Sequence, residues 1–240
     1  MAINFELNTK ITDKTELLQE FFRTFPSYAE NEDNKNLITN AWNFLCNISN
    51  NVQRDANTPY HLHPMRIAAI LANNNLDTQT IVAAFLHNIF TIDNVSEEQI
   101  QQMFGNEVLK IILGTSKLNN IKVKNKTLQE ADNIRKMLFA MVDDLRIILV
   151  KLADRLDRLR NIKNIAIEEQ KSIASEAIDI WAPLAGRLGM SNVKSEFEDL
   201  SLKFTNPDVF LHLKKIVDMK KDERANYLEK AQKEIYKAAN

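Results

Sequence analysis

The sequence predicts an all-α fold, and three observations lead to this expectation. The 240-residue chain contains only four glycines and five prolines, whereas a sheet protein of this size needs far more turn residues. Apolar side chains recur at three- and four-residue spacing, which is the period of a helix face. Residues that start or cap helices stand directly before several of these apolar runs. We therefore expect a helical bundle with a C-terminal helical extension.

The N-terminal part of the chain begins with two expected helices. The first thirty-odd residues, with Phe21-Phe22 and Phe25-Pro26, indicate a helix and a turn packed on the core. Residues 34–53 then carry a stripe of apolar side chains with helical spacing. The stripe consists of Leu37, Ile38, Ala41, Phe44, Leu45 and Ile48.

Local start and stop signals place the next helices. Pro64 stands where a helix starts, and Asp77 with Thr78 offers an N-cap for an apolar helix that reaches Asn88. Ser96-Glu97-Glu98-Gln99 is a capping box that opens a short helix, which stops at Gly105.

The C-terminal half is expected to be helical throughout, apart from one loop. Further helices are expected at 106–118, 127–141, 143–163, 167–187 and 190–203, and a last one runs from Pro207 to the end. The basic segment 119–127 is predicted to be a loop; its charge suits phosphate, although a solvated loop is the more common explanation. Residues 215–236 are rich in Lys, Glu and Ala and predict an exposed helix or a connector.

Composition and charge exclude several classes of protein. The formal net charge is −1, so no overall field attracts nucleic acid or an anionic membrane, and we expect direct binding to neither. The single cysteine, Cys46, excludes an internal disulfide framework and is expected to be a core residue in a reducing compartment. No apolar run has the length of a membrane span, and the N-terminus lacks the pattern of a signal peptide. We expect a cytoplasmic protein.

Two polar residues stand in strongly apolar segments and are candidates for chemistry. His87 ends the apolar run Ala83-Ala84-Phe85-Leu86, and Asp154 follows the run from Ile147 to Ala153. A buried carboxylate is unfavourable unless it is paired, hydrogen-bonded or bound to a metal. Imidazole and carboxylate groups are common ligands of divalent transition metals. Taken singly, each residue is more often a structural polar group, and spacing alone does not predict a metal site.

Together, an ordered series of motifs resembles the hydrolase domain of the RelA/SpoT family, which makes and degrades the guanosine alarmone (p)ppGpp of the stringent response. The resemblance covers nearly the whole chain after about residue 40. Its motifs are Arg54 with Pro59-Tyr60 and His63-Pro64, Ala83-Ala84-Phe85-Leu86-His87, Phe104-Gly105, the run from Asn133 to Met141, Lys151-Leu-Ala-Asp-Arg-Leu, Trp181-Ala-Pro-Leu-Ala-Gly-Arg-Leu-Gly, and Lys194-Ser-Glu-Phe-Glu-Asp-Leu with Phe204.

The resemblance implies an HD-domain helical fold and a metal-dependent 3′-pyrophosphohydrolase activity. Active members of the family hold one Mn²⁺ with two histidines and two aspartates, and these positions fall on His63, His87, Asn88 and Asp154. The metal activates a water molecule that attacks the 3′-pyrophosphate. An acidic pair one helical turn after the second histidine supports the proton transfers.

The chain departs from the family pattern at these chemical positions. Asn88 replaces the aspartate of the HD dipeptide and offers only a neutral amide oxygen. Thr91 and Ile92 replace the Glu-Asp pair, and neither acts as a general acid or base at neutral pH. Asp93 follows one position later, about 100° further around a helix, and is a poor substitute. We therefore expect Mn²⁺ to be absent or weakly bound.

The expected substrate side is also altered. Asp55 stands where the family favours lysine, and a carboxylate there repels a pyrophosphate. Arg158 stands where the family has asparagine, four residues after Asp154, and we hypothesise that it pairs with that carboxylate in place of the metal. The candidates for binding the nucleotide are Arg54, Lys151, Arg158, Arg160 and Asn161.

These observations leave three hypotheses for function. The first is a degenerate hydrolase domain that serves as a regulatory or structural module, so that it is uncertain whether the chain is itself an enzyme. The second is an active Mn²⁺-dependent (p)ppGpp pyrophosphohydrolase with a reduced metal site. The third is a guanine-nucleotide sensor that binds without turnover.

The resemblance also implies a domain organisation and a partner. Residues 1–33 are expected to form an N-terminal helical segment, 34–189 the hydrolase-like domain, and 190–240 a helical connector. The connector resembles the region that leads to a (p)ppGpp synthetase domain in long members of the family. We therefore expect the natural chain to be longer and to include that domain, as a GTP pyrophosphokinase would, since no synthetase motif occurs here.

Overall fold

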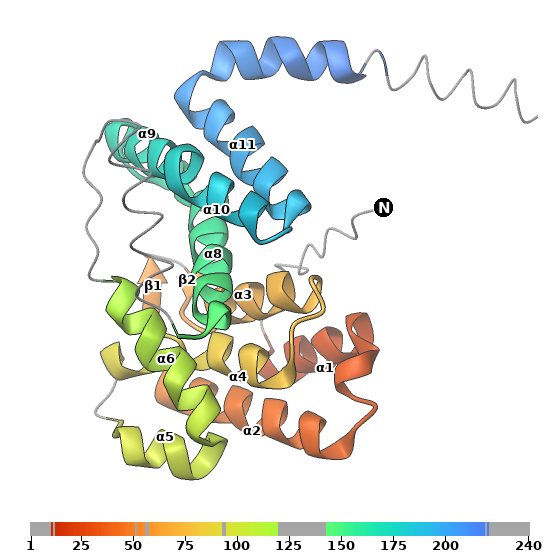
Figure 1. Cartoon of the computed structure of the whole chain (residues 1–240), viewed down its shortest axis with the longest axis vertical. Coiled ribbons are helices and arrows are strands. Elements are labelled where there is room, and N and C mark those ends of the chain that lie inside the picture. The colour runs from red at the N-terminus through yellow and green to blue at the C-terminus, as the bar shows by residue number, and fades with distance from the viewer. Residues whose placement is uncertain are drawn as a thin grey trace, which may run out of the picture.

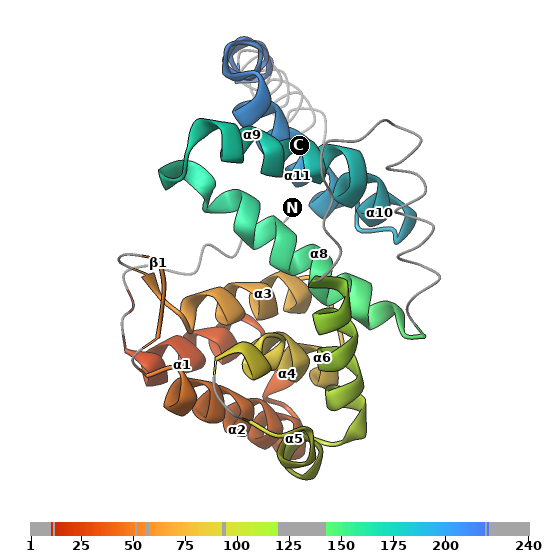
Figure 2. The same ribbon diagram turned by 90° about the vertical axis from the view of Figure 1, so that its left-hand side faces the viewer.

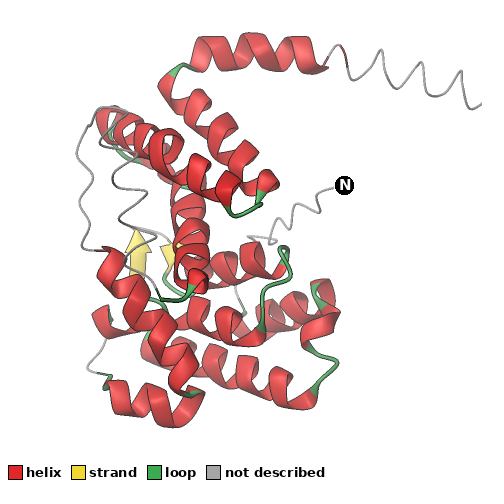
Figure 3. Ribbon diagram, in the orientation of Figure 1, coloured by secondary structure: helices red, strands yellow, loops and turns green. Residues whose placement is uncertain are grey.

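The computed structural model describes residues 11, 13–50, 52–55, 58–92, 95–119, 143–218 and 220. Over these residues the fold is helical, apart from one short pair of strands (Figures 1 and 3). The all-α prediction is therefore confirmed. The expected helix at 127–141 and nearly all of the expected loop at 119–127 lie outside the described residues.

The N-terminal helices pack against the core as expected. The elements are α1 (Lys14–Thr24), the 3₁₀ turn η1 (Pro26–Tyr28) and α2 (Glu32–Ile48). The Asp13 carboxylate caps α1 by accepting from the backbone N–H groups of its first turn. Phe21 is fully buried, and its ring lies 6.2 Å from that of Phe85. Trp42 on α2 is also buried, and the free Cys46 lies beside it in the core, as predicted.

A short hairpin interrupts the helices between α2 and α3. Its strands are β1 (Gln53–Asp55) and β2 (Thr58–Pro59), which pair antiparallel with an irregular register. The helix expected at 34–53 overlaps the first strand, so this hairpin differs from the prediction. Strands of two or three residues are too short to show an alternating pattern, so the difference has a simple cause.

The next helices surround α4, which is almost entirely buried. They are α3 (Leu62–Ala72), α4 (Thr78–Leu86), the 3₁₀ turn η2 (Ile89–Thr91), α5 (Glu97–Phe104) and α6 (Asn106–Asn119). α4 contacts α2, α3 and α6, and all of its side chains except the partly exposed Gln79 are buried. Asp77 caps α4 and Ser96 caps α5, as the sequence predicts. α5 ends at Gly105, whose φ of 88° favours glycine.

The long helix α8 (Leu145–Arg160) runs between the two parts of the molecule (Figure 2). One side of α8 packs on α3, α4 and α6, and the other side contacts α11 and the segment that precedes α10. Its N-cap is Asp144, whose carboxylate also binds Arg146. Because α8 touches both parts, polar residues on its buried face are placed beside the ends of α3 and α4.

The C-terminal helices form the upper part of Figure 1. They are α9 (Ile167–Glu176), a π-helical segment η4 (Ala177–Trp181), α10 (Ala182–Arg187) and α11 (Ser191–Thr205). The helices expected at 167–187 and 190–203 are therefore present, the first with a π-helical turn inside it. Trp181 is buried, and its indole N–H donates to Glu176. A further helix covers residues 207–218.

Candidate metal centre

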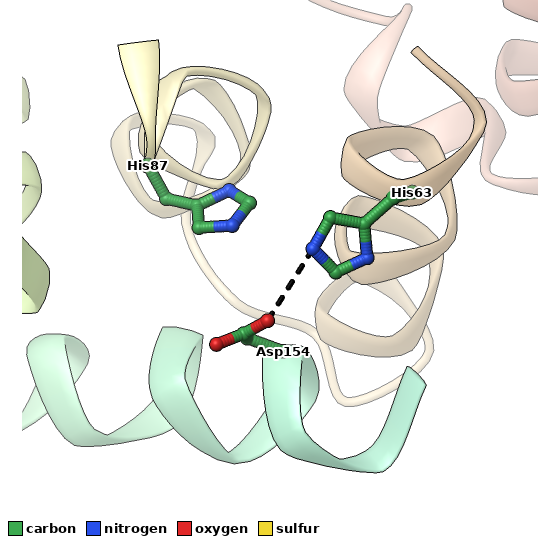
Figure 4. Close-up of side chains that lie close together, drawn as sticks. All are labelled: His63, His87 and Asp154. Atoms are coloured by element: carbon green, nitrogen blue, oxygen red, sulfur yellow. Dashed lines mark ion pairs between the residues drawn. The ribbon is translucent and has the colours of Figure 1, made fainter. Parts of the chain in front are cut away.

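Three helices bring His63, His87 and Asp154 together in the interior of the fold. All three residues are buried, and one potential ligand atom from each lies within 4.8 Å of the others. Figure 4 shows the two imidazole rings and the carboxylate turned toward one another from α3, the end of α4 and α8. The ring centroids of the two histidines are 5.2 Å apart. Residues separated by up to 91 positions in the sequence thus form one cluster.

His87 is fixed by its place at the end of α4. It is the C-cap residue, and its Nδ1 lies 2.8 Å from the carbonyl oxygen of Ala84. A carbonyl only accepts hydrogen bonds, so Nδ1 carries the proton and Nε2 keeps its lone pair. Burial lowers the pKa of His87 to about 3. The ring is therefore neutral at neutral pH and has the form that binds a metal.

Asn88 lies directly beside that lone pair. Its Nδ2 is 2.9 Å from Nε2 of His87, and the amide donates this hydrogen bond. Rotation of the amide by half a turn presents Oδ1 instead, which is a weak, neutral metal ligand. The predicted ligand position is thus adjacent to the cluster, although its side chain is satisfied by a hydrogen bond within the protein.

Asp154 is held from two sides. Its Oδ1 lies 3.3 Å from Nε2 of His63, and its Oδ2 forms an ion pair with the Lys151 ammonium, one turn earlier on α8. Burial tends to raise the pKa of Asp154, but the charge of the neighbouring Lys151 ammonium outweighs it and holds the pKa well below its usual value. The carboxylate is therefore ionised and leaves one oxygen directed at the cluster.

The predicted ion pair between Asp154 and Arg158 does not form, so that hypothesis is wrong. Lys151 is the partner of Asp154, while Arg158 is 42% exposed and lies 3.6 Å from Glu169 on α9. Both spacings suit a helical ion pair. Lys151 is only 3% exposed and needs a partner in the interior, whereas Arg158 reaches an acidic residue near the surface.

Asp157 is a functional candidate that the sequence analysis missed. It is fully buried, and its Oδ2 lies 2.6 Å from Nδ1 of His63. Arg66 donates to both of its oxygens, at 2.5 and 3.2 Å. Despite the unfavourable effect of burial, the bond from His63 and the charge of Arg66 lower the pKa of Asp157. The sequence does offer one signal for Asp157, since it is a second acidic residue in the same apolar helix, three positions after Asp154.

The donor set fits a divalent transition metal only in part. Two neutral imidazoles and one carboxylate suit such an ion. Ligand bonds of about 2.1 Å place opposite ligand atoms about 4.2 Å apart. The three ligand atoms of the cluster lie within 4.8 Å of one another, so they need to move only slightly closer to hold an ion. Asn88 adds a neutral oxygen where the resemblance implies a carboxylate. The chain thus provides three strong ligands and one weak one.

The positions that the resemblance assigns to proton transfer lie beyond the cluster. α4 ends at Leu86, and Thr91 closes the 3₁₀ turn η2 rather than another turn of α4. The Thr91 side chain is exposed, and its hydroxyl donates to the carbonyl of Asn88. Ile92 is half-buried and packs on the hydrophobic core. Asp93 lies outside the described residues. Neither described side chain transfers a proton.

The residues predicted to bind the nucleotide form contacts with different partners in the structure. Arg160 forms a two-point ion pair with Glu196 on α11, at 2.5 and 2.6 Å. Asn161 donates to the backbone and side chain of Asp157. Arg54 lies in β1, and its side chain is outside the described atoms, as is that of Asp55. Nucleotide binding by Arg54, Lys151, Arg158, Arg160 and Asn161 therefore stays a prediction.

Comparison with known proteins identifies related sequences. A family profile described as the HD domain matches residues 41–191. A GTP pyrophosphokinase of Myxococcus xanthus is 38% identical over 196 residues, which are 80% of this chain and 26% of the relative. A guanosine-3′,5′-bis(diphosphate) 3′-pyrophosphohydrolase of Haemophilus influenzae is 37% identical over 182 residues, 76% of this chain and 27% of the relative. The chain thus spans about a quarter of the length of the curated relatives it matches.

A solved structure shares the fold. It is described as a metazoan ortholog of SpoT that hydrolyses ppGpp, and it covers 68% of this chain and 93% of its own length with a TM-score of 0.54. The sequence identity is 20%, so this likeness supports the arrangement of helices. Among the described helices, none has the length and apolar character needed to cross a membrane.

Proposed function

Because this chain belongs to the HD-domain family and its relatives are RelA/SpoT-type enzymes, we propose that it is a (p)ppGpp pyrophosphohydrolase-like domain without turnover. In this role it is a regulatory module of a longer protein of guanosine alarmone metabolism. One observation carries the proposal. The positions for proton transfer hold Thr91 and Ile92, one bonded to a backbone carbonyl and the other packed on the core.

The proposal includes a divalent cation held by His63, His87 and Asp154, with Asn88 as a weak fourth ligand. Such an ion supplies charge for a bound pyrophosphate and lowers the pKa of a ligated water. Lys151 occupies one oxygen of Asp154, so the carboxylate offers the ion a single ligand atom. With one neutral ligand and a nearby ammonium group, this site binds Mn²⁺ more weakly than a site with two free carboxylates.

Proton transfer is the step for which the described residues at the family's acid–base positions offer no ionisable group. The two carboxylates at the cluster, Asp154 and Asp157, are held in ion pairs with Lys151 and Arg66. A carboxylate kept ionised by a buried cation is a poor proton donor to a leaving group. The missing acid–base pair is worth about 10²–10⁴-fold in rate for each group that normally contributes.

The rest of the proposal concerns partners. We propose that residues 34–189 are the HD domain, that 1–33 are an N-terminal addition, and that 190–240 lead to a synthetase domain in the same polypeptide. Long relatives named as GTP pyrophosphokinases support this arrangement. The packing of α11 on α9 and α10 gives such a domain a rigid mechanical link to α8, whose buried face carries Asp154. The expected effectors are guanine nucleotides of the (p)ppGpp class.

A second candidate function, active hydrolysis, is favoured by the intact ligand cluster. His63, His87 and Asp154 each offer one ligand atom, and these atoms lie within 4.8 Å of one another. In this alternative a water molecule or the substrate itself takes the place of the missing acid. The two candidates differ in turnover and agree on metal binding.

A turnover assay with ppGpp and Mn²⁺ separates the candidates. The wild-type chain is expected to release no pyrophosphate, whereas the triple variant Asn88→Asp, Thr91→Glu, Ile92→Asp gains at least about 10²-fold over background. The matched control Asn88→Asp, Thr91→Gln, Ile92→Asn keeps the restored ligand, has side chains of the same size without an ionisable group at positions 91 and 92, and is expected to stay inactive. Repeated turnover by the wild type would overturn the proposal in favour of the active hydrolase.

A further inference from the structure

The carboxylate of Asp157 lies behind His63, on the side of the ring away from the ligand cluster. Its Oδ2 is 2.6 Å from Nδ1 of His63, while Nε2 of the same ring lies 3.3 Å from Asp154 (Figure 4). Asp157 is fully buried. The imidazole therefore lies between a carboxylate at the cluster and a second carboxylate behind it.

This arrangement fixes which nitrogen faces the cluster. An ionised carboxylate only accepts hydrogen bonds, so Nδ1 of His63 donates to Asp157 and Nε2 is left to ligate. A carboxylate, histidine and metal in a row orient the ring and make the ligand nitrogen more basic. His87 reaches the same state through the Ala84 carbonyl. Both ligand histidines are thus held with Nε2 toward the cluster.

Arg66 keeps the second carboxylate in place. Its Nε and terminal nitrogen donate to the two oxygens of Asp157, which is the two-point geometry that arginine forms with carboxylates. Arg66 lies one turn after His63 on α3, and Asp157 lies one turn after Asp154 on α8. Each buried carboxylate therefore has its own cation, Lys151 for Asp154 and Arg66 for Asp157.

We infer that Asp157 and Arg66 are a positioning pair that holds His63 as a metal ligand, so that this chain keeps affinity for a divalent cation although it lacks the catalytic acids. The inference rests on the metal site of the proposed function and not on the loss of turnover. It assigns roles to two residues outside the ligand set. The ligand chemistry is that of a divalent transition ion with a preference for imidazole nitrogen.

A purely structural pair between α3 and α8 would also be buried, so the test needs a matched comparison. Arg160 and Glu196 form a partly exposed structural pair from the same helix, with the same two-point geometry, between α8 and α11. Neither of these two residues contacts His63, His87 or Asp154 in the recorded hydrogen bonds and ion pairs of the described chain. Glu196→Gln therefore reports the loss of a structural pair alone.

Calorimetric titration of the full chain with Mn²⁺ and with Co²⁺ tests the inference. Asp157→Asn is expected to weaken binding of both ions by about 10–100-fold, whereas Glu196→Gln leaves the affinity within about twofold of wild type. The absorption spectrum of bound Co²⁺, which depends on ligand geometry, is expected to change only in Asp157→Asn. A folded Asp157→Asn protein with wild-type affinity for both ions would show that the pair is structural.

A measurement on the wild type covers the case in which Asp157→Asn fails to fold. Nitrogen NMR of the metal-free protein is expected to find a proton on Nδ1 of His63, hydrogen-bonded to a carboxylate. A ring with its proton on Nε2 alone would overturn the inference. So would a wild-type chain that binds neither ion at millimolar concentration, and that result leaves the proposed loss of turnover standing. Conversely, turnover of ppGpp refutes the proposed function without affecting the positioning pair.

Discussion

The two sides of the candidate site have different support in the fold. On the ligand side, each of His63, His87 and Asp154 is buried and bonded to a group that fixes its orientation. On the side where the resemblance places proton transfer, Thr91 is exposed and Ile92 belongs to the apolar packing. The ligand side is thus fixed by buried polar contacts, one of them across 94 residues. The other side depends on a local backbone bond and on hydrophobic contact.

This difference teaches which parts of a site tolerate a change of residue. A buried charge that has a partner is hard to remove, because its partner is then left unpaired in the interior. A residue at an exposed turn is free to change, since little else depends on it. We therefore expect the ligand side to respond strongly to substitution and the other side weakly.

The largest expected effect follows removal of the Asp154 carboxylate. Asp154→Ala leaves the Lys151 ammonium buried without its partner and is expected to lower the free energy of unfolding by about 3–5 kcal/mol. Denaturant unfolding of the metal-free protein measures this change. The double variant Asp154→Leu, Lys151→Met removes both charges and is expected to recover most of the loss. If Asp154→Ala alone leaves the free energy of unfolding unchanged, the ion pair with Lys151 does not stabilise the ligand side.

Acid is expected to have the next largest effect, because the fold keeps two histidines neutral. Burial lowers the pKa of His61 to about 4 and that of His87 to about 3. An unfolded histidine, with a pKa of about 6.5, binds a proton first as the pH falls. The stability that each neutral ring contributes is therefore present above pH about 6.5 and lost toward pH about 4 for His61 and about 3 for His87. These shifts correspond to at most about 3 and 5 kcal/mol, respectively.

Unfolding of the metal-free protein between pH 4 and 7 checks this dependence. His61→Gln is expected to reduce the dependence of the free energy of unfolding on pH, because the contribution of the neutral His61 ring is removed. His212→Gln serves as the control, since His212 is exposed on the helix at 207–218, and it is expected to leave the profile unchanged. Equal profiles for wild type and His61→Gln would contradict the prediction.

The smallest effects are expected on the side without acids, and they distinguish its two residues. Thr91→Glu adds a charge at an exposed position and is expected to change stability by less than about 0.5 kcal/mol. Ile92→Asp removes a side chain that packs on the core and is expected to cost about 1–2 kcal/mol. Thermal and denaturant unfolding of the two single variants measures both values. A larger loss for Thr91→Glu than for Ile92→Asp would reverse this assignment.

Much of the fold was predictable because its signals are local. Asp77 and Ser96 cap helices by bonding backbone groups three residues away, and Gly105 ends α5 with a positive φ. The missed hairpin after α2 has no comparable signal. The ligand residues were predictable from ordered motifs, and their meeting in one cluster is consistent with that prediction.

The sequence by itself determined the helices, their caps and the identity of the candidate ligands, since these depend on spacing within one helix or on a matching motif. Only the tertiary structure decided which charges pair. Lys151 and Arg158 both lie within reach of Asp154 along α8, but Arg158 pairs with Glu169 on α9, which leaves Lys151 as the partner of Asp154. Asp157 meets His63 and Arg66 across more than ninety residues, because the register between α3 and α8 is set by the core that both helices share.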